Sequence, residues 1–265
     1  MKIGFIGAGN MAGAIVKGLV NSGMIEPKNI SIFDIDKDKS KALSKEFGVT
    51  ISRGENSLIG DNDVVVLAVK PFVLDTLLPK VSRALEKKNP LVVSIAVGKT
   101  LRYIEDLLSY SPALVRVMPN INAKVGGAMS AICKNDKVTQ EQLKTVIDIF
   151  SCVGGVTEID ESQFSTFAAV AASSPAFTYM YIDALARSGV KNGMSKTQAL
   201  KIAAQSVLGS AKMILESDEH PWALADQVCS PAGTTIEGVA SLQTSGFEAA
   251  VINAIDAVIA KDKKI

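Results

Sequence analysis

The first residues whose types and spacing suggest chemistry are glycines near the amino terminus. The segment Gly7-Ala8-Gly9-Asn10-Met11-Ala12 matches the pattern G-x-G-x-x-G/A. In that pattern the first glycine permits a tight turn, the second lets the backbone approach a pyrophosphate, and the small last residue lets a helix pack on a strand. A helix that begins here offers unpaired N–H groups to phosphate oxygens. The pattern predicts a dinucleotide site that includes Ile6, Gly7, Ala8, Gly9, Asn10 and Met11.

An acidic residue, Asp34, follows the glycines by about 20 residues and ends the next short apolar run. A carboxylate there can accept a hydrogen bond from the 2′-hydroxyl of the adenosine ribose, and it would repel the 2′-phosphate of NADP. Lys37 and Lys39 lie just beyond and could pair with such a phosphate, although a solvated helix face is the more common place for them. The residues therefore favour NADH and leave NADPH open.

Short apolar runs alternate with helical patterns over the first half of the chain. Strands are expected near residues 2–6, 31–33, 64–69, 91–94 and 113–117, with helices over 11–19 and 37–47. This alternation predicts a Rossmann-type α/β domain with a doubly wound, mostly parallel sheet. Beyond about residue 159 we expect no strand, only Ala-rich helical patterns. We predict a dinucleotide-binding domain over residues 1–159 and an all-helical domain over residues 160–265.

The helical half carries several local signals. Phe164–Lys191 is expected to be a long helix interrupted at Pro175, with Gly193 as its stop. Ser195 and Gln198 have the spacing of a capping box. His220 precedes a proline and is expected to cap a helix rather than to catalyse. Cys229 is expected to be a small apolar filler, because no base is visible near it in the sequence.

Composition excludes several classes of function. The net charge is +1, so the chain has no electrostatic footprint for nucleic acid or an anionic membrane. We find no apolar run of about 20 residues and no secretory leader, and we expect a cytoplasmic protein. Three scattered cysteines and one histidine provide neither a disulfide framework nor a metal-ligand spacing.

Several segments resemble pyrroline-5-carboxylate reductase, and the resemblance runs through the whole chain. They are FIGAGNM at Phe5–Met11, AVKP at Ala68–Pro71, RVMPN at Arg116–Asn120, SSPAF at Ser173–Phe177, EHP at Glu219–Pro221 and CSPAGTTIEG at Cys229–Gly238. The last segment is the most specific. The chain departs from the family pattern at Ile121-Asn122, where Thr-Pro is usual, at Ala171-Ala172, where Ser-Gly is usual, and at Ala232, where the first glycine of the loop is usual.

The resemblance implies reduction of the cyclic imine 1-pyrroline-5-carboxylate to L-proline by NADH or NADPH, the last step of proline biosynthesis. It implies a substrate site at Ser230, Gly233, Thr234 and Thr235, with the Thr235 hydroxyl at the ring nitrogen as the catalytic group. Judged from the residues alone, Ser230 and the threonines could simply cap a helix.

The coenzyme site gains further candidates near the ends of predicted strands. They are Asn56, Ala68, Val69, Lys70, Pro71 and Asn120. Ala68–Pro71 follows a buried strand, where ligands bind in open parallel sheets. Lys70 could also be an ordinary exposed lysine, and Asn120 could cap a turn.

The expected partner is a second copy of the chain. The helical half is rich in alanine, and about 105 residues would struggle to bury its apolar faces alone. The resemblance implies a homodimer through the C-terminal helices, larger rings of dimers, and the Thr235 loop placed against the dinucleotide-binding domain of the partner chain. Two other functions stay open. One is a β-hydroxyacid dehydrogenase, which would need a catalytic lysine within a long helix, whereas Phe177–Lys191 carries lysine only at its end. The other is a non-catalytic dinucleotide-binding paralogue.

Overall fold

The computed structural model describes residues 1–262, which form two compact units. The first unit runs from Met1 to Ala172, and the second begins at Ser173. The predicted boundary between residues 159 and 160 lies just after the last strand of the first unit, which also keeps the short helical turns that follow that strand.

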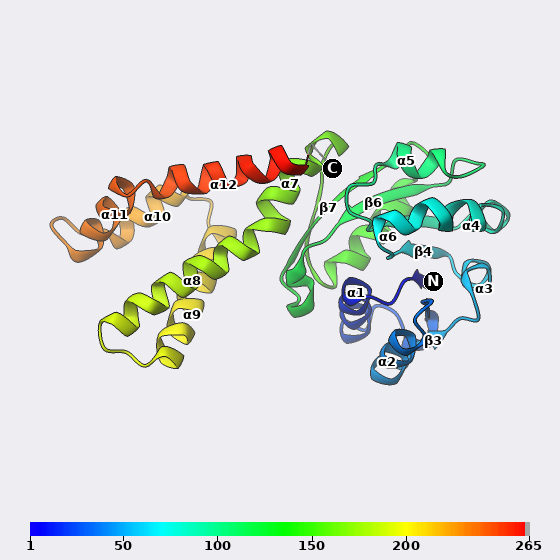
Figure 1. Cartoon of the computed structure of the whole chain (residues 1–265), viewed down its shortest axis with the longest axis horizontal. Coiled ribbons are helices and arrows are strands. Elements are labelled where there is room, and N and C mark those ends of the chain that lie inside the picture. Colours follow the sequence, from blue (N-terminus) through cyan, green and yellow to red (C-terminus); the bar gives the residue numbers. More distant parts are fainter. Residues whose placement is uncertain (263–265) are drawn as a thin grey trace. The chain divides into compact units, whose positions relative to one another are not determined.

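The first unit is built on one eight-stranded sheet (Figure 1). Its strands are β1 (Ile3–Ile6), β2 (Ile30–Phe33), β3 (Thr50–Ile51), β4 (Val64–Leu67), β5 (Leu91–Ser94), β6 (Leu114–Met118), β7 (Ala128–Lys134) and β8 (Gly154–Glu158). Their order is β3-β2-β1-β4-β5-β6-β7-β8, and every neighbouring pair is parallel except β6 and β7. The expectation of a doubly wound, mostly parallel sheet is therefore confirmed.

Helices connect these strands and cover the sheet. They are α1 (Asn10–Asn21), α2 (Lys37–Phe47), α3 (Glu55–Asp61), α4 (Leu74–Lys88), α5 (Leu101–Asp106), α6 (Gln140–Ser151) and α7 (Phe164–Phe167), with short 3-10 turns η1 (Pro27–Asn29), η2 (Pro71–Val73), η3 (Ile121–Val125) and η4 (Glu161–Gln163). The chain reverses its winding direction between β1 and β4, which are adjacent in the sheet although β2 and β3 separate them in sequence. This switch leaves a crevice at the carboxyl ends of the strands, where ligands bind in such sheets.

Strand β4 shows why the apolar runs were strong signals. Val64 and Val66 belong to the core on one face, together with α1 and α6, whereas Val65 and Leu67 belong to the core on the other face, together with α3, α4 and α5. Because successive side chains of a strand point to opposite faces, a strand covered on both sides must be apolar throughout. All four residues of β4 are buried.

Three strands were not expected from the sequence. β3 has only two residues, both exposed. β7 consists largely of small residues, Ala128, Ser130, Ala131 and Cys133 among them, which lack a strong strand preference. β8 begins with two glycines and forms the far edge of the sheet, where no continuous apolar run is required. The absence of strands beyond residue 159 agrees with the structure for the described residues.

The second unit consists of helices α8 (Ser174–Lys191), α9 (Lys196–Glu216), α10 (Pro221–Val228), α11 (Thr234–Thr244) and α12 (Phe247–Asp262). The long helix expected over residues 164–191 is interrupted as predicted. A π-helical segment, η5 (Ala168–Ser173), ends just before Pro175, which lies in the first turn of α8. Gly193, the predicted stop, has φ +98°, and the Ser195 side chain caps α9 by accepting the N–H of Gln198.

This second unit buries little of its apolar surface within one chain. Helices α8 and α9 pack side by side through the small residues Ala186, Ala199 and Ala203. Helices α10, α11 and α12 have no buried residue, and large side chains such as Leu208 (62% exposed) and Leu215 (86% exposed) face outward. Of the helices described, none has the length and apolarity that crossing a membrane requires.

Candidate functional site

The glycine turn between β1 and α1 is the first element of the site. Gly7 has φ +108°, and a Cβ atom built on it would lie 2.5 Å from the carbonyl oxygen of Ala68. Its N–H donates to the carbonyl oxygen of Phe33 at 2.7 Å. Gly7 is therefore required both by its backbone conformation and by the close approach of the neighbouring strand end.

Gly9 has a different role in the same turn. It is the N-cap residue of α1, its φ of −76° is open to any residue, and no side chain caps the helix. A Cβ atom on Gly9 would meet nothing within 4 Å. The start of α1 is therefore unobstructed, and its backbone N–H groups can receive the pyrophosphate of a dinucleotide. Ala12, which is 1% exposed, lets the helix lie close to the sheet.

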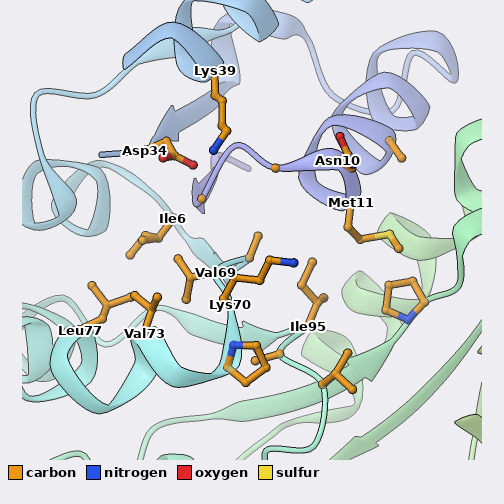
Figure 2. A pocket seen from close by; sticks show the side chains of 18 of the residues that line it. Ile6, Asn10, Met11, Asp34, Lys39, Val69, Lys70, Val73, Leu77 and Ile95 are labelled. Atoms are coloured by element: carbon orange, nitrogen blue, oxygen red, sulfur yellow. The ribbon is translucent and has the colours of Figure 1, made fainter. Parts of the chain in front are cut away.

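A cavity of ≈ 760 Å³ extends from this turn along the carboxyl ends of β1, β2, β4, β5 and β6. Ten of the predicted coenzyme residues line it: Ile6, Gly7, Gly9, Asn10, Met11, Asp34, Ala68, Val69, Lys70 and Pro71. The cavity lies at the switch between β1 and β4, as expected for a dinucleotide on this kind of sheet. Figure 2 shows Lys70 reaching into it from one wall, with its ammonium nitrogen directed toward the side where Met11 lies.

Three predicted coenzyme residues do not line the cavity. Ala8 is buried, and its N–H donates to the Asp34 carboxylate at 2.7 Å. Asn56 is an exposed residue in the first turn of α3, although its neighbour Glu55 does line the cavity.

Asn120 is the third of these residues. Its side-chain oxygen accepts the N–H of Asn122 and so caps η3, and its amide group donates to the carbonyl oxygen of Ala171 at 2.8 Å. The capping role that the sequence left open is therefore the one that this side chain performs. The same side chain connects two of the three segments in which the chain departs from the family pattern, Ile121-Asn122 and Ala171-Ala172.

The cavity also includes residues that the sequence analysis missed. Ile95, Ala96 and Val97 follow β5, and Ile121 and Lys124 belong to η3. The rule that ligands bind at the carboxyl ends of parallel strands applies to β5 as well as to β4. Applied to the predicted strand at residues 91–94, it would have indicated Ile95–Val97.

Arg116 anchors the wall of the cavity that β6 forms. Its side chain is 7% exposed and pairs with Glu161 at 2.9 Å. Glu161 also accepts the N–H of Leu101, and the guanidinium group lies over the ring of Phe164, 4.3 Å from its centre. Because both charges are partnered, the pair holds β6 against the segment after β8 without an uncompensated buried charge. Burial raises the pKa of nearby Cys133 to about 12.

The predicted substrate loop lies in the second unit. Gly233 is the N-cap of α11, and no side chain caps this helix, so Ser230 and the threonines do not serve as its cap. Thr234 and Thr235 are the first two residues of α11 and are exposed. Ser230 and Gly233 form a turn closed by a 3.0 Å backbone hydrogen bond, and a Cβ atom on Gly233 would lie 2.3 Å from the Ser230 Oγ.

Two further predictions concern residues that precede this loop in the sequence. The His220 side chain accepts the N–H of Trp222 at 3.2 Å and caps α10, as predicted. Cys229 is half-buried and has a free thiol. Ala232 has φ +55°, so the position where the family pattern has glycine is in the left-handed region.

The first unit defines the class of protein. Residues 2–98, which include the glycine turn, Asp34 and Lys70, match the family described as NADP oxidoreductase, coenzyme F420-dependent. A glycine turn, an unobstructed helix start and a cavity at the switch point of a doubly wound sheet fit a nicotinamide dinucleotide. The chain is an NAD(P)-dependent oxidoreductase.

Full-length comparisons identify the family. Residues 161–265 match the family described as pyrroline-5-carboxylate reductase dimerisation. The chain is 42% identical over 264 residues to pyrroline-5-carboxylate reductase of Escherichia coli (strain K12), covering 100% of this chain and 98% of that one. It is 40% identical over 264 residues to the Methanosarcina acetivorans protein of the same name, covering 100% of this chain and 97% of that one. The chain belongs to the pyrroline-5-carboxylate reductase family.

Solved structures agree with this assignment. A pyrroline-5-carboxylate reductase from Coxiella burnetii superposes with a TM-score of 0.94 at 32% identity, covering 99% of this chain and 97% of that one. The Plasmodium falciparum pyrroline carboxylate reductase, solved with NADP bound, gives a TM-score of 0.87 at 30% identity, covering 100% of this chain and 97% of that one.

Proposed function

We propose that this protein reduces 1-pyrroline-5-carboxylate to L-proline with NADH or NADPH, as the last step of proline biosynthesis in the cytoplasm. The observation that carries the proposal is the dinucleotide cavity at the switch point of the sheet, in a chain that aligns over its full length with pyrroline-5-carboxylate reductases. We take the functional boundary to lie near residue 160, where the strands end and the dimerisation family begins.

The first unit holds and orients the coenzyme. Bound NAD(P)H supplies a hydride to the C=N carbon of the imine. The N–H groups at the start of α1, beside Gly9, receive the pyrophosphate. Lys70, which lines the cavity at the end of β4, would hold the nicotinamide ribose, and the apolar residues after β4 and β5 would exclude water from the reacting side.

The second unit supplies the substrate groups. Ser230, Gly233 and Thr234 hold the substrate carboxylate in the loop and at the uncapped start of α11, where N–H groups favour an anion. The Thr235 hydroxyl contacts the ring nitrogen and is the catalytic group. A cyclic imine can arrive already protonated, so positioning matters more than a strong acid. The only histidine, His220, caps a helix, and the reaction does not require it as a proton donor.

We propose that the working form is a homodimer through the C-terminal helices, and that such dimers assemble into a larger ring. The support is the exposed apolar surface of α8–α12, together with the match of residues 161–265 to a dimerisation family. In this proposal the Thr235 loop of one chain serves the coenzyme site of its partner.

The reaction is tested by incubating the purified protein with 1-pyrroline-5-carboxylate and each coenzyme, and following coenzyme oxidation together with L-proline. We expect equal amounts of proline formed and coenzyme oxidised. A Gly9→Val variant is the control for the coenzyme site. Coenzyme binding without any proline would contradict the proposed reaction and would favour a non-catalytic paralogue. Oxidation of a β-hydroxyacid instead would favour the dehydrogenase alternative.

The shared site is tested by mixing two impaired variants, Gly9→Val and Thr235→Val, and refolding them together. A mixed dimer would contain one site with both defects and one site with neither. We expect activity to recover toward half of the wild-type value per mixed dimer, compared with each variant refolded alone. Absence of recovery despite proven mixing, or an active monomer in sedimentation, would contradict the shared site.

A further inference from the structure

One end of the dinucleotide cavity is lined by two carboxylates and one lysine. Asp34, Asp36 and Lys39 all line the cavity just beyond β2. In this fold the adenosine ribose lies at the end of the second strand, so these residues surround the place where NADH has a 2′-hydroxyl and NADPH has a 2′-phosphate. Figure 2 shows Asp34 and Lys39 together, on the side of the glycine turn away from Lys70. Lys37, the other lysine of this segment, does not line the cavity.

The Asp34 carboxylate is fixed in place by backbone groups. Its Oδ2 accepts the N–H of Ala8 at 2.7 Å, and its Oδ1 accepts the N–H of Asp36 at 2.8 Å. A carboxylate has about four acceptor sites, so two remain for ribose hydroxyls. The Asp34 carboxylate is therefore held against the glycine turn. It can accept a hydrogen bond from a ribose hydroxyl without moving.

Asp36 engages a backbone N–H at the start of α2 and the lysine that could otherwise bind a phosphate. Its Oδ1 accepts the N–H of Asp38 at 3.1 Å and so caps α2, and its Oδ2 pairs with the Lys39 ammonium at 3.2 Å. The hydrogen bond from Lys39, followed by the backbone N–H of Asp38, lowers the pKa of the Asp36 carboxyl. Asp36 is therefore ionised at neutral pH, and it competes with any phosphate for both the helix start and the lysine.

These observations point to a choice of coenzyme. Two carboxylates and one ammonium group leave a net charge of −1 around the ribose. Glu55, which also lines the cavity, is paired with Lys80 at 2.7 Å. A 2′-phosphate would therefore enter a negatively charged site in which it must compete with Asp36 for Lys39 and for the Asp38 N–H. We propose that Asp34 and Asp36 together select NADH over NADPH. This inference rests on the proposed coenzyme site, whereas the identity of the imine substrate does not enter it.

The test measures the dissociation constants of NADH and NADPH for the full-length protein by calorimetry, without substrate. We expect NADH to bind at least about tenfold more tightly, since a hydrogen bond to a charged group contributes that much. Asp34→Ser and Asp36→Ser should each shift the ratio toward NADPH by about tenfold or more. Asp34→Asn removes the charge and keeps an acceptor for Ala8, and it should shift the ratio in the same direction.

Two controls separate this inference from its alternatives. Asp38 pairs with Lys41 outside the cavity, so Asp38→Ser should leave the ratio unchanged. Lys39→Ser should widen the preference for NADH, because it removes the cavity ammonium that pairs with Asp36. The inference would be overturned if the wild type preferred NADPH and Lys39→Ser lost NADPH binding while its NADH binding was unaffected. That result would show that Lys39 binds the 2′-phosphate. Higher ionic strength should narrow the preference, because it screens the repulsion.

The outcomes distinguish this inference from the proposed reaction. Equal binding of both coenzymes, or preference for NADPH, overturns the selection by Asp34 and Asp36 and leaves the reaction standing. Preference for NADH without turnover of 1-pyrroline-5-carboxylate supports the selection and contradicts the reaction. Failure to bind either coenzyme would overturn both the coenzyme selection and the proposed reaction, provided that circular dichroism shows a folded protein that melts cooperatively.

Discussion

Gly9 and Gly7 lie two residues apart in the same turn, and the structure predicts opposite consequences for replacing them. The perturbation is Gly9→Val. Gly9 has extended φ and ψ angles of −76° and −177°, and a Cβ atom there meets nothing within 4 Å. The fold should therefore accept valine. The same open space is where the pyrophosphate must approach the start of α1, so the valine side chain should exclude the coenzyme.

The magnitude follows from the hydrogen bonds that would be lost. Charge-assisted bonds from backbone N–H groups to a phosphate contribute about 1.5–3 kcal/mol. Loss of one such bond raises the dissociation constant of the coenzyme by about 10- to 150-fold. Calorimetric titration of wild type and Gly9→Val with NADH measures this directly, and thermal unfolding of the same samples should give nearly equal melting temperatures.

Gly7→Ala is the matched control, because it should damage the fold first. A Cβ atom on Gly7 would lie 2.5 Å from the Ala68 oxygen and 2.7 Å from the Ala68 carbonyl carbon, at φ +108°. The positive φ alone costs an L-residue about 1–2 kcal/mol, and the backbone must also move. At about 2–4 °C per kcal/mol, the melting temperature should fall by several degrees. Wild-type coenzyme affinity in Gly9→Val would refute the placement of the pyrophosphate, and equal melting losses in both variants would refute the contrast.

Three further predictions concern single positions. Thr235→Val should lower turnover by about ten- to a hundredfold, because a hydrogen bond worth roughly 1–3 kcal/mol is lost in the transition state. Unchanged steady-state turnover would exclude Thr235 as the catalytic group. Ala232→Gly should raise the free energy of unfolding by up to about 1 kcal/mol, because glycine adopts the φ of +55° without strain. The greater entropy of glycine in the unfolded chain offsets part of this gain. Urea titration measures this, and a loss of stability would contradict the strain. Cys133, with a pKa raised by burial to about 12, should resist iodoacetamide at pH 8 until the protein is denatured. Rapid labelling of the native protein, located by mass spectrometry, would contradict that.

The parts of the fold that the sequence predicted are those in which local pattern and tertiary environment agree. β4 and β5 are buried on both faces, so their apolar runs could be recognised without knowledge of the fold. β7 could not be recognised in this way. It pairs with β6 in the antiparallel direction, and most of its residues are small ones that lack a strong strand preference, so no local pattern reveals it.

The residues of the candidate site differ in the same way, because some have a local sequence signal and others do not. Gly7, Gly9 and Asp34 form a motif whose spacing reflects its geometry, and all three line the cavity. Asn120 was predicted from the end of a strand, yet its side chain caps η3 and donates to Ala171, a residue 51 positions away in sequence. A distant partner of this kind leaves no local signal. The alanine at position 232 does not itself indicate a positive φ, and the one signal in the sequence was the glycine that the family pattern has at this position.

The two halves of the proposed site should depend on assembly to different degrees. Each residue that lines the dinucleotide cavity belongs to the first unit, which has extensive cores on both faces of its sheet. The proposed substrate loop precedes α11, a helix with no buried residue, in a unit whose buried core within one chain is small. Since a helix gains most of its stability from packing an apolar face, we expect α11 to need a partner chain to hold Thr235 in one position. Dilution below the dissociation constant of the dimer should therefore abolish turnover while coenzyme binding persists. Loss of turnover with coenzyme binding retained would show that the C-terminal helices complete the active site in addition to forming the dimer, whereas turnover that persists on dilution would contradict this.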